Sequence, residues 1–166
     1  MIVKTILCVA GLLISTQTQV QHLSCVPDIK LMPDYFDVKF TREDKKQINC
    51  LAENIYHEAR GEPEKGMVAV TNVVMNRVAD NGFPKTPCSV ITEKNKKLCQ
   101  FSWVCSKKRI VKPDDGMIKI AEQAYTNDLP DVTGGALFFH ADYVKPRWKY
   151  RRTVVIGGHI FYKGKT

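Results

Sequence analysis

The chain has 166 residues, and its composition of 44% hydrophobic and 25% charged residues is that of a globular protein, which excludes a largely disordered chain. A chain of this length can bury a hydrophobic core within a single domain. Its 25 basic and 17 acidic residues give a net charge of +8, which favours anionic partners such as nucleic acid, anionic membranes or the acidic polymers of a cell envelope.

The first 21 residues have the pattern of an export signal. Lys4 precedes an apolar run over residues 5–14, which is too short to span a bilayer comfortably, and a polar stretch follows. We expect residues 1–21 to be a signal peptide, with an uncleaved N-terminal anchor as the alternative. The protein is therefore expected to be secreted or periplasmic, with no stable membrane insertion once the leader is removed. Residues 22–40 are expected to form an extended lead-in.

Two helices are predicted next. Thr41 and Asp44 form a capping box ahead of apolar residues at helical spacing, and Gly61 ends this first helix. Pro63 is well placed as the first residue of a second helix, which extends to about residue 79. This second helix is apolar on nearly every side, which predicts that it is buried nearly all round.

The second half of the chain predicts loops, one more helix and then strands. Residues 81–115 are rich in glycine and proline, with a solvated basic cluster at 94–97, and a third helix is expected from residue 114 or 115 to about 126. Strands are predicted at 136–141, 153–156 and 159–163, the last two joined as a hairpin. Helices first and strands last indicate an α+β fold.

The cysteines indicate disulfides. Five cysteines remain after the leader: Cys25, Cys50, Cys88, Cys99 and Cys105. The last three of these lie within 18 residues of one another. An odd number allows at most two bridges. We expect a short bridge within the cluster of three and a second bridge between Cys25 and Cys50. A zinc site is the competing interpretation, but the sequence has no C-x-x-C pair, so no metal is predicted.

Glu58 is the strongest candidate for chemistry. It follows Leu51 by seven residues and Ile55 by three, so its side chain is expected at the edge of the apolar stripe of the helix. Partial burial there raises the pKa of a carboxyl group, and an acid that stays protonated near neutral pH can protonate the leaving oxygen of a glycosidic bond. An ordinary glutamate paired with Arg60 or a lysine is the alternative, and spacing does not choose between the two.

Two neighbours of Glu58 have competing interpretations. Glu62 is a candidate second active-site carboxylate, but a favourable charge near the start of the second helix is the preferred role. His57 points away from the apolar stripe and is expected to be exposed. The string from His57 resembles the zinc motif H-E-x-x-H, but Gly61 stands where the second histidine is required, so that interpretation fails.

A loop near residue 100 has the composition of a sugar-binding site. Residues 100–103 combine aromatic rings with amide and hydroxyl groups, which can stack on a sugar and bond its substituents. Packing of these aromatics into the core is the equally open alternative, and Trp148 has the same two interpretations. For His140 and His159, which lie in apolar strands, a hydrogen-bonded core histidine is the more common outcome.

The run over residues 51–78 resembles the SleB-type cell-wall hydrolases, which include the spore-cortex-lytic enzymes and their phage relatives. Shorter motifs follow in the same order at 82–84, 88–91, 100–102, 133–139, 148 and 156–162, so that the resemblance covers about residues 48–163. It implies a lysozyme-like α+β domain related to lytic transglycosylases, within residues 41–166, with a short antiparallel sheet near the C-terminus.

The resemblance also implies an activity. Members of this family cleave peptidoglycan glycan strands between N-acetylmuramic acid and N-acetylglucosamine, so Glu58 is expected to be the single general acid/base of a monomeric enzyme without a cofactor. The candidates for glycan binding are Gln100, Phe101, Ser102, Trp103, Gly134, Gly135, His140, Trp148 and His159.

Two other functions stay open. Some relatives were labelled amidases, so an N-acetylmuramoyl-L-alanine amidase is one alternative, and a non-catalytic basic glycan-binding module is the other. Residues 145–152 form the only basic stretch with interleaved aromatics, but the export signal argues against nucleic acid. The cysteine-flanked loop at 99–105 resembles the phage and Gram-negative branch of the family, which favours a phage or envelope role over spore germination.

Overall fold

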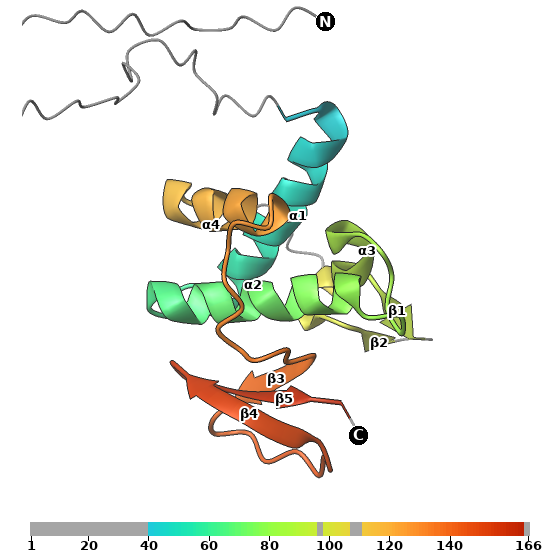
Figure 1. Ribbon diagram of the computed structural model, residues 1–166, viewed down its shortest axis with the longest axis vertical. Coiled ribbons are helices and arrows are strands. Elements are labelled where there is room, and N and C mark those ends of the chain that lie inside the picture. Colours follow the sequence, from blue (N-terminus) through green and yellow to red (C-terminus); the bar gives the residue numbers. More distant parts are fainter. Residues whose placement is uncertain (1–39, 96–97, 107–110, 165–166) are drawn as a thin grey trace, which may run out of the picture. The chain divides into compact units, whose positions relative to one another are not determined.

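The computed structural model describes residues 40–95, 98–106 and 111–164 (Figure 1). The predicted leader, the lead-in as far as residue 39, and Cys25 lie outside these residues. None of the helices in the described part of the chain combines the length and apolarity needed to cross a membrane.

The two long helices begin and end close to the predicted residues. Helix α1 spans Arg42–Ala59 and α2 spans Glu64–Ala79. The capping box is confirmed, because the Thr41 hydroxyl accepts a hydrogen bond from the Asp44 amide at 3.2 Å and the Asp44 carboxylate accepts one from the Thr41 amide at 2.9 Å. Pro63 is the N-cap of α2 rather than its first helical residue.

The segment between α2 and the next long helix contains more structure than the sequence predicts. It holds a five-residue helix, a minimal hairpin and a 3₁₀ turn: α3 (Pro87–Ile91), β1 (Lys94–Asn95), β2 (Leu98–Cys99) and η2 (Ser102–Cys105). Helix α4 then spans Asp115–Tyr125, as predicted, with the Asp114 side chain accepting a hydrogen bond from the Met117 amide at 2.9 Å.

The C-terminal strands form a three-stranded antiparallel sheet in the order β3-β5-β4. These strands are β3 (Phe138–Ala141), β4 (Arg151–Ile156) and β5 (His159–Lys163). The predicted hairpin between the last two strands is confirmed. Gly157, with φ of +55°, supplies the left-handed backbone conformation that its turn requires.

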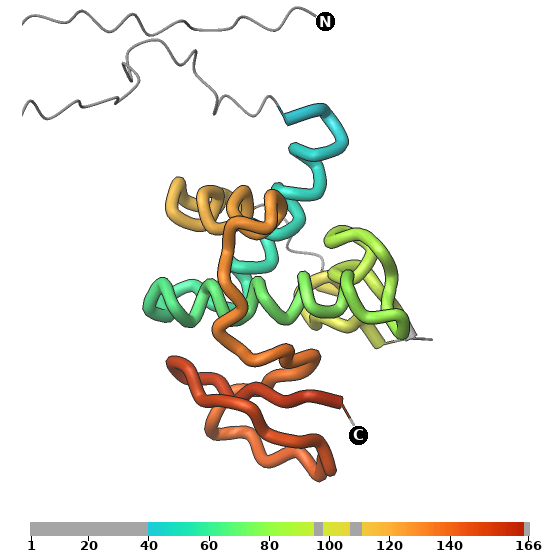
Figure 2. Tube along the Cα trace, viewed as in Figure 1, coloured from blue at the N-terminus to red at the C-terminus, as the bar shows by residue number. Residues whose placement is uncertain are grey.

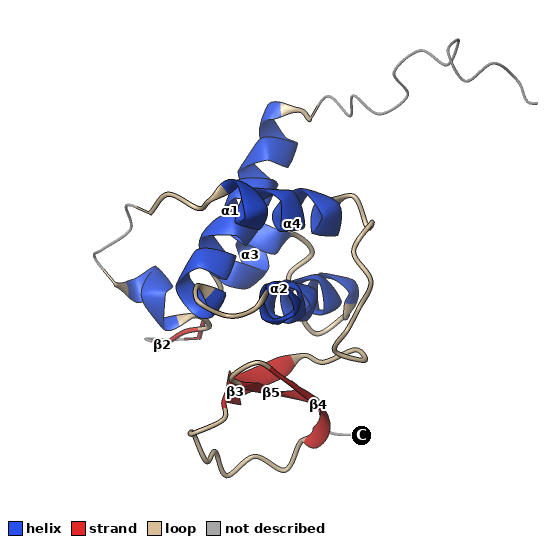
Figure 3. Ribbon diagram, turned by 90° about the vertical axis from the view of Figure 1, so that its left-hand side faces the viewer, coloured by secondary structure: helices blue, strands red, loops and turns tan. Residues whose placement is uncertain are grey.

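Helix α2 lies between two layers (Figures 1 and 3). One face packs against α1, α3 and α4 in the larger hydrophobic core, and the other packs against the sheet, where Val70 and Val73 meet Ile156 and Phe161. The prediction that this helix is buried nearly all round is confirmed, since only residues at its two ends are exposed. Figure 2 shows the connection from α4 running past α2 to reach the sheet.

Polar side chains of α2 hold that connection in place. The side-chain oxygen of Asn72 accepts a hydrogen bond from the Val132 backbone amide at 3.0 Å. The side-chain NH₂ group of Asn76 donates a hydrogen bond to the Ala136 backbone carbonyl at 3.1 Å. Asn72 is buried, so this bond satisfies a polar group that would otherwise be costly to bury. The start of the sheet is therefore fixed to the central helix.

Within the described part of the chain, disulfides connect Cys50 with Cys88 and Cys99 with Cys105. The short bridge within the cysteine cluster is confirmed. The predicted Cys25–Cys50 bridge is wrong, because the packing of α3 on α1 brings Cys88 to Cys50. In that contact the Cys88 amide donates a hydrogen bond to the side-chain oxygen of the buried Gln47 at 2.9 Å.

Candidate active site

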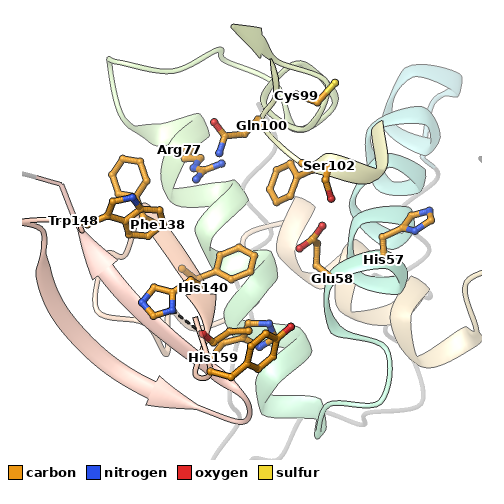
Figure 4. A pocket seen from close by; sticks show the side chains of 14 residues that line it. His57, Glu58, Arg77, Cys99, Gln100, Ser102, Phe138, His140, Trp148 and His159 are labelled. Carbon is orange, nitrogen blue, oxygen red and sulfur yellow. Dashed lines mark hydrogen bonds between the residues drawn. The ribbon is translucent and has the colours of Figure 1, made fainter. Parts of the chain in front are cut away.

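A pocket of about 500 Å³ lies between the helical layer and the sheet (Figure 4). Its lining comes from the ends of α1 and α2, the segment that joins β2 to η2, the strands β3 and β5, and the connection after β3. The lining residues are His57, Glu58, Arg77, Cys99, Gln100, Phe101, Ser102, Phe138, Phe139, His140, Ala141, Tyr143, Trp148 and His159.

Glu58 reaches this pocket from the last turn of α1. Leu51 and Ile55, which precede it on the same helix, are buried in the core, and Glu58 lies at the edge of their stripe with an intermediate exposure. Figure 4 shows its carboxyl group pointing into the pocket, while the His57 side chain points away from it. Among the described residues, no side chain or backbone group forms a hydrogen bond or ion pair with this carboxyl group.

Burial raises the pKa of Glu58 from its usual 4.5 to about 6. The cause is desolvation of the carboxylate, since no cation compensates for the loss of water. A substantial fraction of Glu58 is therefore protonated at a pH near 6, where an exposed glutamate would be fully ionised. This is the property required of a general acid.

The raised pKa predicts a pH-dependent cost in stability. Because its folded-state pKa lies above the unfolded value, Glu58 costs no stability below about pH 4.5, and its cost develops as the pH rises through about 6. Glu58→Gln should therefore raise the free energy of unfolding by about 2 kcal/mol at pH 7.5. Urea denaturation at pH 4 and pH 7.5 measures this, and a gain of equal size at both pH values would contradict it.

Arg77 forms the floor of the pocket on the α2 side. Only 2% of its surface is exposed, and its Nε donates a hydrogen bond to the Leu137 carbonyl at 2.7 Å. Its guanidinium carbon lies within 6 Å of the centroids of three aromatic rings, those of Phe83, Phe101 and Phe138. Burial lowers the pKa of Arg77 to about 10, so the side chain keeps its positive charge at neutral pH.

Arg77 in turn orients Gln100. When the Gln100 amide is placed with its oxygen toward Arg77, that oxygen accepts hydrogen bonds from both terminal guanidinium nitrogens at 3.0 and 3.1 Å. This orientation leaves the NH₂ group of Gln100 available to donate to a ligand in the pocket. A fixed amide donor of this kind suits the hydroxyl or N-acetyl oxygen of a sugar.

Aromatic side chains form the opposite wall. The Trp148 ring is 44% exposed and lies 6.2 Å from the Phe138 ring and 5.6 Å from the His140 ring. His140 Nδ1 lies 2.8 Å from the Ala141 carbonyl oxygen, which can only accept, so Nδ1 donates this hydrogen bond, and Nε2 lies 2.9 Å from the Tyr162 hydroxyl oxygen. The His140 ring is thus fixed, and Trp148 presents apolar surface on which a sugar ring can stack.

His159 and Glu62 connect the pocket to the β4–β5 turn. The Glu62 carboxylate accepts a hydrogen bond from the Gly158 amide at 3.0 Å and lies 3.8 Å from Nδ1 of His159. Burial lowers the pKa of His159, which keeps its imidazole neutral at neutral pH. A Cβ atom at Gly157 would displace the Glu62 carboxylate from this position, and the φ of +55° also favours glycine in this turn. Glu62 does not line the pocket, and its contacts are those of a residue that holds the turn in place.

The structure separates the predicted glycan-binding residues into two groups. Six of them line the Glu58 pocket: Gln100, Phe101, Ser102, His140, Trp148 and His159. The other three do not. Gly134 and Gly135 form a turn before β3, where their φ values of +66° and +78° explain the need for glycine. Trp103 is buried in the larger core and is 8% exposed. Packing of this aromatic side chain into the core was one of the two alternatives that the sequence left open.

His57 is half-buried, so the prediction that it is exposed was wrong. Its ring stacks on Trp103 at a centroid distance of 4.3 Å, and its Nε2 is buried without a partner among the described residues. Sequence reasoning also missed Arg77, Phe138 and Tyr143 as pocket residues. Of these residues, Arg77 is the one that the sequence could have indicated. A charged arginine within an apolar, buried helix needs a polar partner, which marks it as a residue with a specific role.

Histidine, cysteine and acidic side chains do not gather in groups of three or more that could hold a metal ion within the described ranges. The groups that face the pocket are Glu58, the Arg77–Gln100 pair and the aromatic wall.

Comparison with known proteins gives the family. The sequence profile of the cell wall hydrolase family matches residues 61–162. Curated relatives include the spore cortex-lytic enzymes of Bacillus cereus and Oceanobacillus iheyensis. Both are 34% identical to the chain and align with 72% of it, but with only 45% and 42% of their own lengths. The chain thus spans less than half of these relatives.

A solved structure covers the same region. The catalytic domain of the germination-specific lytic transglycosylase SleB from Bacillus anthracis superposes with a TM-score of 0.62 and 32% identity, covering 76% of this chain and 98% of that domain. The predicted lysozyme-like α+β fold agrees with this match. Glu58 lies three residues before the region matched by the family profile, so its role rests on the pocket geometry. Given these matches, the chain belongs to the cell wall hydrolase family.

Proposed function

We propose that the protein is a lytic transglycosylase that cleaves peptidoglycan glycan strands between N-acetylmuramic acid and N-acetylglucosamine. The observation that carries the proposal is Glu58, a carboxyl group that points into a pocket and has a pKa of about 6 because of burial alone. The similarity to a solved lytic transglycosylase domain supports the same reaction.

The single carboxyl group accounts for both proton transfers. Protonated Glu58 donates its proton to the glycosidic oxygen as the bond from that oxygen to C1 of the muramyl residue breaks. The C6 hydroxyl of the same muramyl residue then forms a bond to C1, and its proton passes to the Glu58 carboxylate. The product is a 1,6-anhydro-muramyl end, no water is consumed, and Glu58 returns to its protonated state. A second catalytic carboxylate is not required, which agrees with the contacts of Glu62.

The remaining pocket residues are proposed to bind and orient the glycan. Trp148 offers a ring face for stacking, and Gln100, held by Arg77, offers a fixed amide donor. Ser102 and the neutral His159 add polar groups along the same pocket. We propose that the protein acts as a monomer at the cell wall after export, without a cofactor.

Product analysis tests the reaction. Purified peptidoglycan is digested with the protein, and the soluble products are identified by mass spectrometry. We expect muropeptides with 1,6-anhydro-muramyl ends. Muropeptides with ordinary reducing ends would instead identify water as the acceptor and make the enzyme a hydrolase. Release of free stem peptides with intact glycan would contradict glycan cleavage and identify an amidase.

A further inference from the structure

A second pocket adjoins the candidate active site. It has a volume of about 480 Å³ and lies beside the end of α1 and the η2 turn, lined by Tyr56, His57, Arg60, Ser102, Trp103, Ser106 and Val111. His57 and Ser102 line both pockets, so the two lie next to each other and share these side chains as a wall. A substituent that branches from a sugar bound beside Glu58 would reach the second pocket by passing over this shared wall.

Arg60 gives this second pocket a defined charge. It is exposed at the C-cap of α1, and one of its terminal nitrogens donates a hydrogen bond to the Tyr56 hydroxyl at 3.1 Å. Its guanidinium carbon also lies 5.0 Å from the centroid of the Tyr56 ring. Both contacts restrict the guanidinium group before any ligand binds, which lowers the entropic cost of using it for recognition.

No anion of the protein neutralises this charge among the described residues. The residues that line the second pocket include no aspartate or glutamate, and Arg60 forms no ion pair within the described ranges. His57 does not add a second charge, because burial and the nearby Arg60 both lower its pKa and leave the imidazole neutral. Among the described residues, the lining of the second pocket thus combines the preorganised guanidinium of Arg60 with the ring of His57 stacked on Trp103.

We propose that the second pocket binds a carboxylate of the stem peptide that branches from the muramyl residue, and that Arg60 is the residue that recognises it. This inference rests on the proposed function, because it requires a glycan strand beside Glu58. A guanidinium group matches a carboxylate with two parallel hydrogen bonds, whereas a lysine would offer only a point charge. A helix C-terminus also favours a basic side chain on electrostatic grounds, but that effect does not require a pocket or a bond to Tyr56.

The test compares glycan strands that carry stem peptides with strands from which an amidase has removed them. We expect Arg60→Gln to lower kcat/KM about 10- to 100-fold on strands with stems and to leave it unchanged on stem-free strands. Arg60→Lys should recover part of the loss. Arg42→Gln is the matched control, since Arg42 is an exposed arginine at the opposite end of the same helix.

A binding measurement makes the test independent of turnover. A disaccharide that carries a stem peptide is titrated calorimetrically into the wild type and into Arg60→Gln, alongside the same ligand with every carboxylate amidated. The amidated ligand should bind the wild type as weakly as the acidic ligand binds the variant, and the variant should not distinguish the two ligands.

The outcomes separate the two proposals. Equal losses on both kinds of strand, or a variant that still prefers the acidic ligand, would overturn the second pocket as a carboxylate subsite while leaving glycan cleavage intact. A wild type that releases no glycan fragments from either kind of strand would overturn the proposed function itself.

Discussion

Replacing Glu58 by glutamine should lower kcat on peptidoglycan by about 10²- to 10⁴-fold and leave KM close to the wild-type value. Glutamine has nearly the same shape, so the pocket stays intact, but it cannot donate a proton to the glycosidic oxygen. In the wild type, kcat/KM should fall as the pH rises above about 6, because the reactive form of Glu58 is the protonated one. Release of soluble muropeptides at a series of pH values measures both effects.

The control for this variant is Glu53→Gln. Glu53 lies on the same helix, five residues earlier, and does not line the Glu58 pocket. Its replacement removes the same charge from α1 and should leave both kcat and the pH profile unchanged. Wild-type turnover by Glu58→Gln, or an identical loss in Glu53→Gln, would show that the carboxyl group in the pocket is not the general acid.

Removing the Cys50–Cys88 bridge should cause the largest loss of stability. The two cysteines are 38 residues apart, and the loop-entropy relation gives a loss of about 4 kcal/mol in the free energy of unfolding for a double serine variant. The bridge joins α1 to α3, so its loss also weakens the support of the helix that carries Glu58. Urea denaturation of the oxidised wild type and the variant measures the difference.

The second bridge is the internal comparison. Cys99 and Cys105 are separated by only 6 residues, so the same relation gives a loss of about 2 kcal/mol for their replacement. If both double variants lose the same stability, loop length does not determine the effect, and specific native contacts do. Because Cys99 also lines the Glu58 pocket, only this second variant is expected to change activity directly.

The long helices and the final hairpin were predictable because their signals are local. The Thr41 capping box, the apolar spacing along α1 and the Gly157–Gly158 turn each act within a few residues. The α3 helix and the Cys50–Cys88 bridge were missed for the opposite reason. Their positions depend on the packing of α3 against α1 and on the bond from Cys88 to the buried Gln47, which connects residues 41 apart.

The site was predictable where a side chain is placed by its own helix. Glu58 follows directly from its position relative to Leu51 and Ile55. Phe101 and Trp103 lie two residues apart in one loop, and both pack in the larger core. Only the geometry of the η2 turn places Phe101 at the Glu58 pocket and Trp103 at the second pocket. Arg77 became part of the site because the sheet packs across the end of α2, a long-range arrangement that leaves no periodic signal in the sequence.

Because α2 separates two hydrophobic cores, the acid and the aromatic wall belong to different packing environments. Leu51 and Ile55, which position Glu58, lie in the larger core, whereas His140 belongs to strand β3 and Trp148 packs beside Phe138 and His140 of that strand. Substitutions that reshape the aromatic wall can therefore alter which sugars are accepted without changing the acidity of the carboxyl group. This architecture allows substitutions to change the substrate preference and the proton-transfer chemistry independently of each other.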